Sequence, residues 1–266
     1  MANRYNIEEL ILYIEALFLA AGMDADKSAI VAQLLVEADL MGHTTHGIAQ
    51  APAYLSGLEN GLMLGTGNPI TVSDRGATIT WDGQRICGVW LTAMAIDLSV
   101  DRAKKYGTAT MAIRRSGHIA CLAAFLTRAT DKGCMIELAS SDPSIVSVAP
   151  YGGTKPAFTP NPIAIGIPTN KNPILIDISA SITTNGLTGR LFSEGKKLPG
   201  DWVQDKSGRA TNDPSVLFTE PPGTILPIGG KEYGHKGFGL ALMIEALTQG
   251  LSGLGRADPP EGWGAA

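Results

Sequence analysis

The feature that most constrains the fold is an alternation of short strand-like runs with longer helical runs after residue 65. The strand-like runs are rich in Ile, Val and Thr and are bounded by Gly, Pro or Asn, as buried strands are. The helical runs repeat apolar residues every three or four positions. This alternation predicts a layered α/β domain. Strands are expected within 70–83, 108–114, 134–141, 161–168 and 173–179, helices within 90–107, 119–133 and 240–253, and a loop-rich excursion at 183–224.

The first 65 residues have a different texture and predict a helical segment. Asn6 followed by Glu9 resembles a capping box at the start of an apolar helical repeat. We therefore divide the chain into a helical N-terminal segment, 1–65, and an α/β domain, 66–266. The expected helices cover about 7–21, 26–40 and 51–59.

Composition excludes several classes of protein. The chain has 266 residues and a net charge of −4, and its Lys and Arg residues are dispersed, so we expect no nucleic-acid partner. The apolar run in the first helix is too short and too interrupted to cross a membrane. Three widely spaced cysteines predict neither a disulfide framework nor a zinc knuckle. Without a secretory leader pattern, the expected location is the cytoplasm.

The segment GHTTHG, residues 42–47, holds two of the four histidines. It falls at a helix–helix junction, where free backbone N–H groups favour anions. His46 suits acid–base chemistry because imidazole exchanges protons near neutral pH. A histidine that only satisfies a helix end is an equally open interpretation. A zinc site from His43, His46 and His118 is a third, although the usual motif context is missing.

Three further segments contain residues that could bind a ligand or take part in catalysis. His118 follows Arg114 and Arg115 at a strand-to-helix junction, where ligands of α/β proteins collect and where a guanidinium can hold a carboxylate. Asp177 follows a very apolar run, so its charge needs a partner. The segment GGKEYGHKGFG, 229–239, opens a helix and carries a Lys, which makes a phosphate cradle plausible. It matches neither a Walker loop nor the GxGxxG fingerprint.

Four motifs in the same order resemble those of a known family, the malate/L-lactate dehydrogenases of the L-sulfolactate dehydrogenase type. Its members include ureidoglycolate dehydrogenase, 2,3-diketogulonate reductase and Δ1-piperideine-2-carboxylate reductase. The resemblance covers nearly the whole chain, from about Ile7 to Gly253. The motifs are ADLMGHTTHGIAQAPAYLSGLENG, the SSDP…PYGG…NPIAIGIP segment, DWVQDKSGRATNDP and LPIGG…HKGFGLALMIEAL.

The resemblance implies a fold and an activity. The fold would be the distinctive mixed-sheet α/β fold of this family, not a Rossmann fold, with residues 66–266 binding the cofactor. The activity would be hydride transfer between NAD or NADP and a small 2-hydroxy or 2-oxo acid, or a cyclic imino acid. Homodimers are typical of the family, and no metal is implied.

Site roles carried over from the resemblance fall on particular residues. The proton-donating histidine falls on His46, a second active-site histidine, assigned as the base in some members, on His118, and a buried acid on Asp177. Substrate contacts are expected from Thr45, Gln50, Tyr54 and Arg115. Cofactor contacts are expected from Ser141, Asp177, Ile178, Ser179, His235 and Lys236.

Two departures from the family pattern stand out. Gln50 occupies a position where the family often has Arg, and Gln cannot form a charged fork with a carboxylate. Arg114 or Arg115 would then take over, or the substrate differs. The sequence also ends at Ala266, whereas relatives usually continue. Two alternative hypotheses stay open. One is a zinc-dependent hydrolase that uses His43, His46 and His118, and the other, favoured by the short C-terminus, is a catalytically inactive binding protein.

Overall fold

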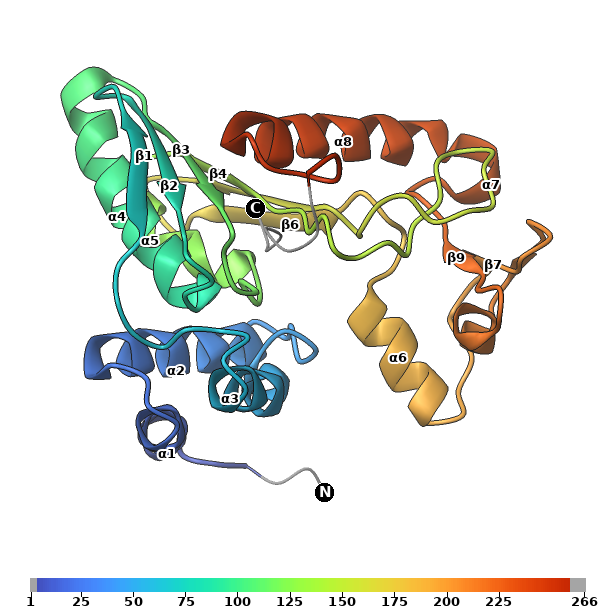
Figure 1. The fold of residues 1–266 in the computed structure, drawn as a ribbon, viewed down its shortest axis with the longest axis horizontal. Coiled ribbons are helices and arrows are strands. Elements are labelled where there is room, and N and C mark those ends of the chain that lie inside the picture. Colours follow the sequence, from blue (N-terminus) through green and yellow to red (C-terminus); the bar gives the residue numbers. More distant parts are fainter. Residues whose placement is uncertain (1–3, 259–266) are drawn as a thin grey trace. The chain divides into compact units, whose positions relative to one another are not determined.

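A computed structural model describes residues 4–258 of the chain. These residues form two compact units: one contains residues up to 138 together with 164–176, and the other contains 139–163 and residues from 177 onward. The described elements include both helices and strands, which confirms the α/β class (Figure 1). The boundary expected between residues 65 and 66 stays a prediction.

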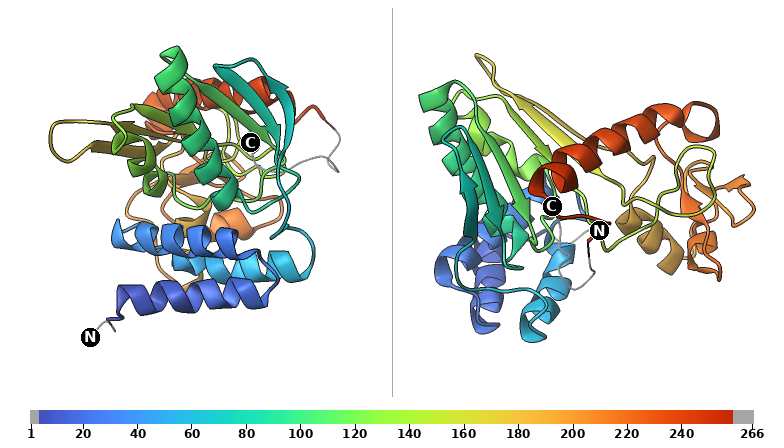
Figure 2. Two further views of the ribbon diagram at one scale, coloured as in Figure 1. Left: turned by 90° about the vertical axis from the view of Figure 1, so that its left-hand side faces the viewer. Right: turned by 45° about the horizontal axis from the view of Figure 1, so that its top comes forward.

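The N-terminal part of the first unit is helical, as the sequence predicts. Its helices are α1 (Ile7–Ala20), α2 (Ala25–Leu40) and α3 (Ala51–Glu59), with a 3-10 turn at Ile48–Gln50 before α3. Asn6 caps α1, because its Oδ1 accepts a hydrogen bond from the Glu9 N–H at 3.1 Å. Figure 2 shows α1 and α2 lying side by side, and Phe18 of α1 and Leu35 of α2 are fully buried members of the same core cluster.

A small mixed sheet follows these helices. Strand β2 (Thr78–Asp82) pairs antiparallel with β1 (Ile70–Asp74) and parallel with β3 (Thr110–Arg114). Helix α4 (Gly88–Tyr106) connects the two parallel strands and covers the sheet, burying Val89, Leu91 and Ala93 (Figure 1). Gly107 ends α4 with a φ of +88°, which only glycine adopts at little cost.

The expected helix at 119–133 is largely wrong. Only a 3-10 turn at Ala123–Phe125 and the short α5 (Thr127–Thr130) are helical there. The preceding residues 119–122 form an irregular stretch in which Ala120 has a φ of +56°. Residues 119–126 are all buried, so their apolar side chains reflect burial on every side. Their spacing therefore does not distinguish a helix from a buried loop.

A second three-stranded sheet has the order β4-β5-β6, and its strands contribute residues to both compact units. The strands are β4 (Ile136–Ala139), β5 (Pro162–Ile167) and β6 (Ile174–Ser179), all within the expected ranges. Among the described residues, no helix combines the length and the apolar character that crossing a bilayer requires.

The second unit contains more regular structure than the sequence predicts. The excursion at 183–224 holds a helix because Thr184 Oγ1 accepts from the Leu187 N–H at 3.2 Å and caps it, although two glycines lower its helix propensity. Its elements are α6 (Asn185–Ser193), β7 (Val203–Gln204), β8 (Ala210–Thr211), a 3-10 turn at Pro214–Phe218 and β9 (Thr224–Ile225); α7 (Gly230–Tyr233) and α8 (His235–Glu245) follow, continued by a π-helical turn at Ala246–Gly250.

The start of α8 lies against the end of β6 because residue 237 has no side chain. A Cβ atom on Gly237 would stand 2.7 Å from the Ala180 carbonyl oxygen and 2.4 Å from the Ile228 nitrogen. Ile228 itself donates its N–H to Ala180 at 2.9 Å. Gly237 therefore sets how closely the segment that begins with His235 approaches the strand that ends at Ser179.

Replacement of Gly237 by Ala is expected to lower the free energy of unfolding by about 1–3 kcal/mol, because the new methyl group overlaps backbone atoms that cannot move independently. Urea denaturation followed by circular dichroism measures the change. The matched control is Gly189→Ala in α6, where a Cβ atom meets nothing within 4 Å. This control is expected to leave stability unchanged or to raise it by up to about 1 kcal/mol. Equal effects of the two substitutions would contradict the account.

Candidate functional site

The GHTTHG segment forms a compact turn after α2. Gly42 has a φ of +88°, and the His43 N–H donates to the Ala38 carbonyl at 2.9 Å, which closes the helix end. The His46 N–H then donates to the His43 carbonyl at 2.8 Å. Backbone hydrogen bonds thus fix the position of His46 at the helix–helix junction, where the sequence predicts it.

The carboxylate of Asp39 ties this turn to the next helix. One of its oxygens accepts the Ile48 N–H at 2.9 Å. A Cβ atom on Gly47 would lie 2.4 Å from the Asp39 carboxyl carbon, so a residue with a side chain does not fit. Asp39 was not predicted from the sequence as a residue of this turn. The sequence feature that could have indicated it is an acidic residue eight positions before Gly47.

The His46 ring is held by its own neighbours. The Thr45 hydroxyl lies 2.8 Å from His46 Nδ1, and the Gln50 side-chain amide donates to the Thr45 carbonyl at 2.7 Å. His46 is half-buried. Thr45 and Gln50, both predicted as substrate contacts, therefore also orient the histidine that the sequence proposes as the acid.

His118 lies beside His46, with ring centroids 6.1 Å apart. The buried hydroxyl of Tyr54 is 2.8 Å from His118 Nδ1 and 3.2 Å from the His118 carbonyl oxygen. The Ala120 N–H also reaches Nδ1, at 3.3 Å. The structure thus brings together four predicted site residues, because it places His118 beside Thr45, His46 and Tyr54, which lie more than 60 residues earlier in the sequence.

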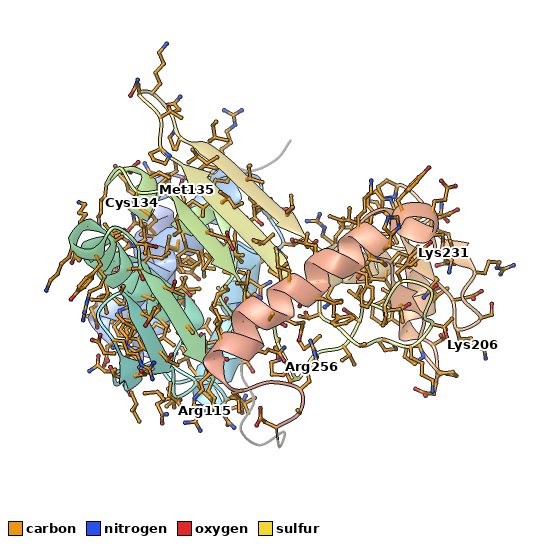
Figure 3. All side chains as sticks on the ribbon, turned by 90° about the horizontal axis from the view of Figure 1, so that it is seen from above. Arg115, Cys134, Met135, Lys206, Lys231 and Arg256 are labelled. Atoms are coloured by element: carbon orange, nitrogen blue, oxygen red, sulfur yellow. The ribbon has the colours of Figure 1, made fainter. Side chains whose placement is uncertain are left out.

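Arg115, the predicted carboxylate anchor, is already engaged. Its guanidinium makes two bonds to Asp82, at 2.9 and 2.5 Å, and Arg114 Nε reaches the same carboxylate at 3.3 Å. Burial of Asp82 acts to raise its pKa, but hydrogen bonds from Arg115 and Gln84 outweigh it and hold that pKa below its ordinary value. Figure 3 shows Arg115 at the end of the β1–β2–β3 sheet.

Asp82 is a residue that the sequence reading missed. It is only 3% exposed and follows an apolar strand, so its charge had to find a partner. The signal available in the sequence is the adjacent pair Arg114–Arg115 at the end of a strand expected in the same sheet. The backbone is strained nearby, since Gln84, Arg85 and Arg115 have φ values of +52°, +61° and +53°.

The alternative zinc site does not form from the three histidines. Within residues 4–258, His43, His46 and His118 do not bring their nitrogens together as one set of ligand atoms. The contact that His46 and His118 make is instead a tilted ring-to-ring approach.

In the second unit, Ser141 is buried within a polar network. Its hydroxyl donates to Glu245 Oε1 at 2.7 Å and accepts from Gln249 Nε2 at 2.9 Å. Arg256, labelled in Figure 3 near the end of α8, bonds both oxygens of Glu245 at 3.2–3.3 Å. Ser141 therefore uses its hydroxyl to hold the segment after β4 to the end of α8 and the turn that continues it, and its expected cofactor contact stays a prediction.

The other predicted cofactor residues lie at the end of β6 and the start of α8. Ile178 is exposed, Asp177 is half-buried, and the Ser179 hydroxyl donates to the Ser181 carbonyl at 2.8 Å. His235 and Lys236 are exposed in the first turn of α8. Gly237 brings these two segments into contact, as described by the distances from its missing Cβ atom.

These residues fit an anionic, hydroxyl-bearing group such as a dinucleotide. Lys236 supplies an exposed cation in the first turn of the 11-residue helix α8. The same unit also leaves a fully buried acceptor, Asn161 Oδ1, without a protein partner, in a residue whose φ of +49° is strained. The cofactor contacts that the sequence assigns to these residues stay a prediction.

Solved structures share the fold. The chain superposes on delta1-piperideine-2-carboxylate reductase from Pseudomonas syringae with a TM-score of 0.86 and 29% identity, covering 96% of this chain and 75% of that one. It also superposes on sulfolactate dehydrogenase from Methanocaldococcus jannaschii with a TM-score of 0.82 and 28% identity, covering 98% and 75%. The distinctive α/β fold expected from the resemblance is thereby confirmed.

Sequence comparison agrees with the fold. The family model for malate/L-lactate dehydrogenase matches residues 5–263. L-sulfolactate dehydrogenase of Methanothermobacter thermautotrophicus is 30% identical over 266 residues, 97% of this chain and 75% of that protein. Hydroxycarboxylate dehydrogenase B of Escherichia coli is 30% identical over 252 residues, 94% and 69%. The chain therefore belongs to the malate/L-lactate dehydrogenase family, a class of oxidoreductases.

Replacement of Asp82 by Asn is expected to lower the free energy of unfolding at pH 7 by about 1–3 kcal/mol, because two guanidinium groups lose a charged acceptor. The pKa of Asp82 is lowered in the folded state, so its contribution is present above the unfolded-state pKa of about 3.9 and is lost as the pH falls further. The gap between wild type and variant should therefore close below about pH 4.

Denaturant titrations between pH 3 and pH 8 measure this gap. Asp74→Asn is the matched control, because Asp74 also pairs with an arginine but is much more exposed. Its effect is expected to stay within about 1 kcal/mol. A gap for Asp82→Asn that does not narrow at all as the pH falls from 8 to 3 would contradict the assignment.

Proposed function

We propose that the protein is an NAD(P)-dependent oxidoreductase that transfers a hydride between nicotinamide and a small 2-hydroxy or 2-oxo acid. The observation that carries this proposal is the pair of histidines, His46 and His118, held 6.1 Å apart by Thr45 and Tyr54. Family membership supports it, since the relatives described above are named dehydrogenases or reductases of such acids. We also propose a cytoplasmic homodimer.

His46 is the proposed proton donor in the reduction direction and the acceptor in the oxidation direction. Imidazole is the side chain suited to this exchange near neutral pH. Its orientation supports the role, because the Thr45 hydroxyl lies 2.8 Å from Nδ1 and so fixes the direction of the ring. Asp177 is the proposed third catalytic residue, as a charged group in β6.

The cofactor, when bound, supplies or accepts the hydride. We propose that Lys236 and His235 hold its phosphates and that Ser141, Asp177, Ile178 and Ser179 supply further contacts. Exposure of Lys236 at the start of α8 supports the phosphate role. Whether NAD or NADP is preferred is left to a binding titration.

The substrate is held without the arginine that the family pattern often provides. The Gln50 side-chain amide donates a hydrogen bond to the Thr45 carbonyl, and the Arg115 guanidinium is paired with Asp82. A neutral Gln beside the acid favours a substrate with little negative charge near that position. Cyclic imino acids are therefore the second candidate class, supported by a relative named Delta(1)-pyrroline-2-carboxylate/Delta(1)-piperideine-2-carboxylate reductase in Pseudomonas syringae pv. tomato, which is 31% identical over 246 residues.

A titration of the purified protein with NADH and NADPH, followed by fluorescence, is expected to show saturable binding of at least one of them. A panel of 2-oxo acids and cyclic imines is then screened by loss of the reduced cofactor's absorbance. Turnover of a 2-oxo acid supports the first class, and turnover of a cyclic imine supports the second. Saturable cofactor binding with no turnover across the panel would favour a binding protein, and no binding would reject the proposal.

Replacement of His46 by Ala is expected to lower kcat by about 10²–10⁴-fold, because general acid help of that size is lost. Cofactor affinity should stay within a factor of about two, since the proposed cofactor contacts lie in other segments. His43→Ala is the matched control, because it removes the other histidine of the turn and keeps the backbone hydrogen bonds that His43 makes there. Near-wild-type turnover in His46→Ala would reject His46 as the acid.

A further inference from the structure

We propose that a cavity in the second unit binds a phosphate monoester, with Lys231 as the cation that holds it. The cavity has a volume of about 170 Å³ and is lined by residues 150–153, 226–227 and 230–231 together with Gln204. A single water needs about 10–15 Å³ of such space, so the cavity has room for a larger group. All the lining residues belong to the second unit, and none has a role in the proposed function.

The wall of the cavity contains a buried amide whose orientation is fixed. Gln204 is only 1% exposed, and its Nε2 donates to the Gly153 carbonyl at 2.8 Å and to Thr224 Oγ1 at 2.7 Å. Its Oε1 accepts from Lys231 Nζ at 2.8 Å. Because a carbonyl only accepts and an ammonium only donates, the amide takes this one orientation. Gln204 therefore holds the Lys231 ammonium against the cavity.

The Lys231 ammonium keeps its charge and most of its hydrogen-bonding capacity. An ammonium has three N–H donors, and Gln204 accepts one of them. The Gln204 amide is neutral, so it does not compensate the positive charge. Within residues 4–258, Lys231 makes no ion pair with a carboxylate. Two donors and a full positive charge thus remain for a ligand in the cavity.

The charge of the cavity wall favours an anion. Among the lining residues, all of which the structure describes, Lys231 is the one that carries an ammonium, a guanidinium or a carboxylate. The acidic residues next to Gln204 and Lys231 in the sequence, Asp205 and Glu232, do not line the cavity. The Asp205 carboxylate pairs instead with Arg209 at 3.4 Å. The nearest fixed charge for a bound group is therefore positive.

Glycines open the wall to a ligand. Gly152, Gly153 and Gly230 contribute main chain without side chains to the lining. Gly152 and Gly230 have φ values of +80° and +61°, which residues with a side chain adopt only at a cost. A small group in the cavity can therefore approach the backbone as well as the ammonium.

These features match a phosphate monoester better than a carboxylate. A phosphate monoester carries a charge of about −1.5 to −2 at pH 7 and three acceptor oxygens. Lysine commonly binds phosphate as a point charge, whereas a carboxylate is bound best by the planar fork of arginine. The combination of one ammonium, two free donors and open backbone thus selects the more highly charged, tetrahedral group.

Two sources supply this chemistry, free phosphate and the 2′-phosphate of NADP. The second source is suggested by Tyr151 in the wall, whose ring meets the edge of the His235 ring at 5.6 Å between centroids. The cavity therefore adjoins the start of α8, where the proposed function places the cofactor. A preference for NADP over NAD rests on that proposed function, whereas binding of phosphate does not.

Phosphorus-31 NMR of inorganic phosphate with the purified full-length chain tests the site at pH 8 and constant ionic strength. Saturable line broadening is expected with the wild type, and Lys231→Gln should weaken binding about 10–100-fold because one charged donor is lost. Lys206→Gln is the matched control, since Lys206 is an exposed lysine of the same unit that does not line the cavity (Figure 3). Absence of saturable binding, or equal binding by wild type and Lys231→Gln, would overturn the proposal.

Lys231→Arg separates the charge from the rest of the side chain. Lys231 is exposed, so both of its variants are expected to keep the wild-type fold, which circular dichroism checks. The arginine variant retains a positive charge and should retain detectable phosphate binding. A folded arginine variant that loses binding as completely as Lys231→Gln would overturn the role given to the charge of Lys231.

Fluorescence titrations with NADPH and NADH distinguish the two sources. If the 2′-phosphate of NADP is the ligand, Lys231→Gln weakens NADPH binding about 10–100-fold and leaves NADH binding within a factor of about two. If free phosphate is the ligand, both cofactor affinities stay unchanged while phosphate binding is lost. An equal loss for both cofactors would overturn the assignment to a monoester. A wild type that binds neither cofactor would reject the proposed function and leave the phosphate titration to decide the site.

Discussion

The site depends on one short contact, between the Asp39 carboxylate and the turn that follows α2. This carboxylate accepts the Ile48 N–H and lies where a side chain on Gly47 would stand. The contact reverses the chain within a few residues, which places His46 in the turn and starts α3, the helix that carries Tyr54. Thr45, beside the His46 ring, and Tyr54, beside the His118 ring, thus flank one hydrogen bond between the Ile48 N–H and the Asp39 carboxylate.

The two arginines that the sequence suggests as substrate anchors are paired with an aspartate in the structure. Arg114 and Arg115 read as free anchors for a carboxylate, yet both guanidinium groups face Asp82. Around the two histidines the structure assembles neutral partners, namely a threonine hydroxyl, a glutamine amide and a tyrosine hydroxyl.

Much of the fold was predictable from the sequence, because periodic helices and short apolar strands carry local signals. The α1–α3 helices, the strands from β1 to β6 and the α4 stop at Gly107 all follow from such patterns. The stretch at 119–133 did not, because uniform burial erases the period that tells a helix from a buried loop. The Asp82 pairing was also beyond reach, since it joins β2 to the residue after β3 through sheet register. His46 was identified from its motif, but the contacts of Tyr54 with His118 arise only in three dimensions.

The left-handed backbone at Gln84, Arg85, Arg115 and Ala120 has a consequence for how this region tolerates sequence change. At such positions the positive φ restricts which residue types fit, whatever the role of the side chain. Gly, Asn and Asp are the replacements that adopt this conformation most readily. Saturation libraries will therefore show a narrow, similar spectrum of survivors at all four sites, whatever each side chain contributes. A lost phenotype there reports the shape of the main chain first, and only a Gly-matched comparison isolates the role of the side chain.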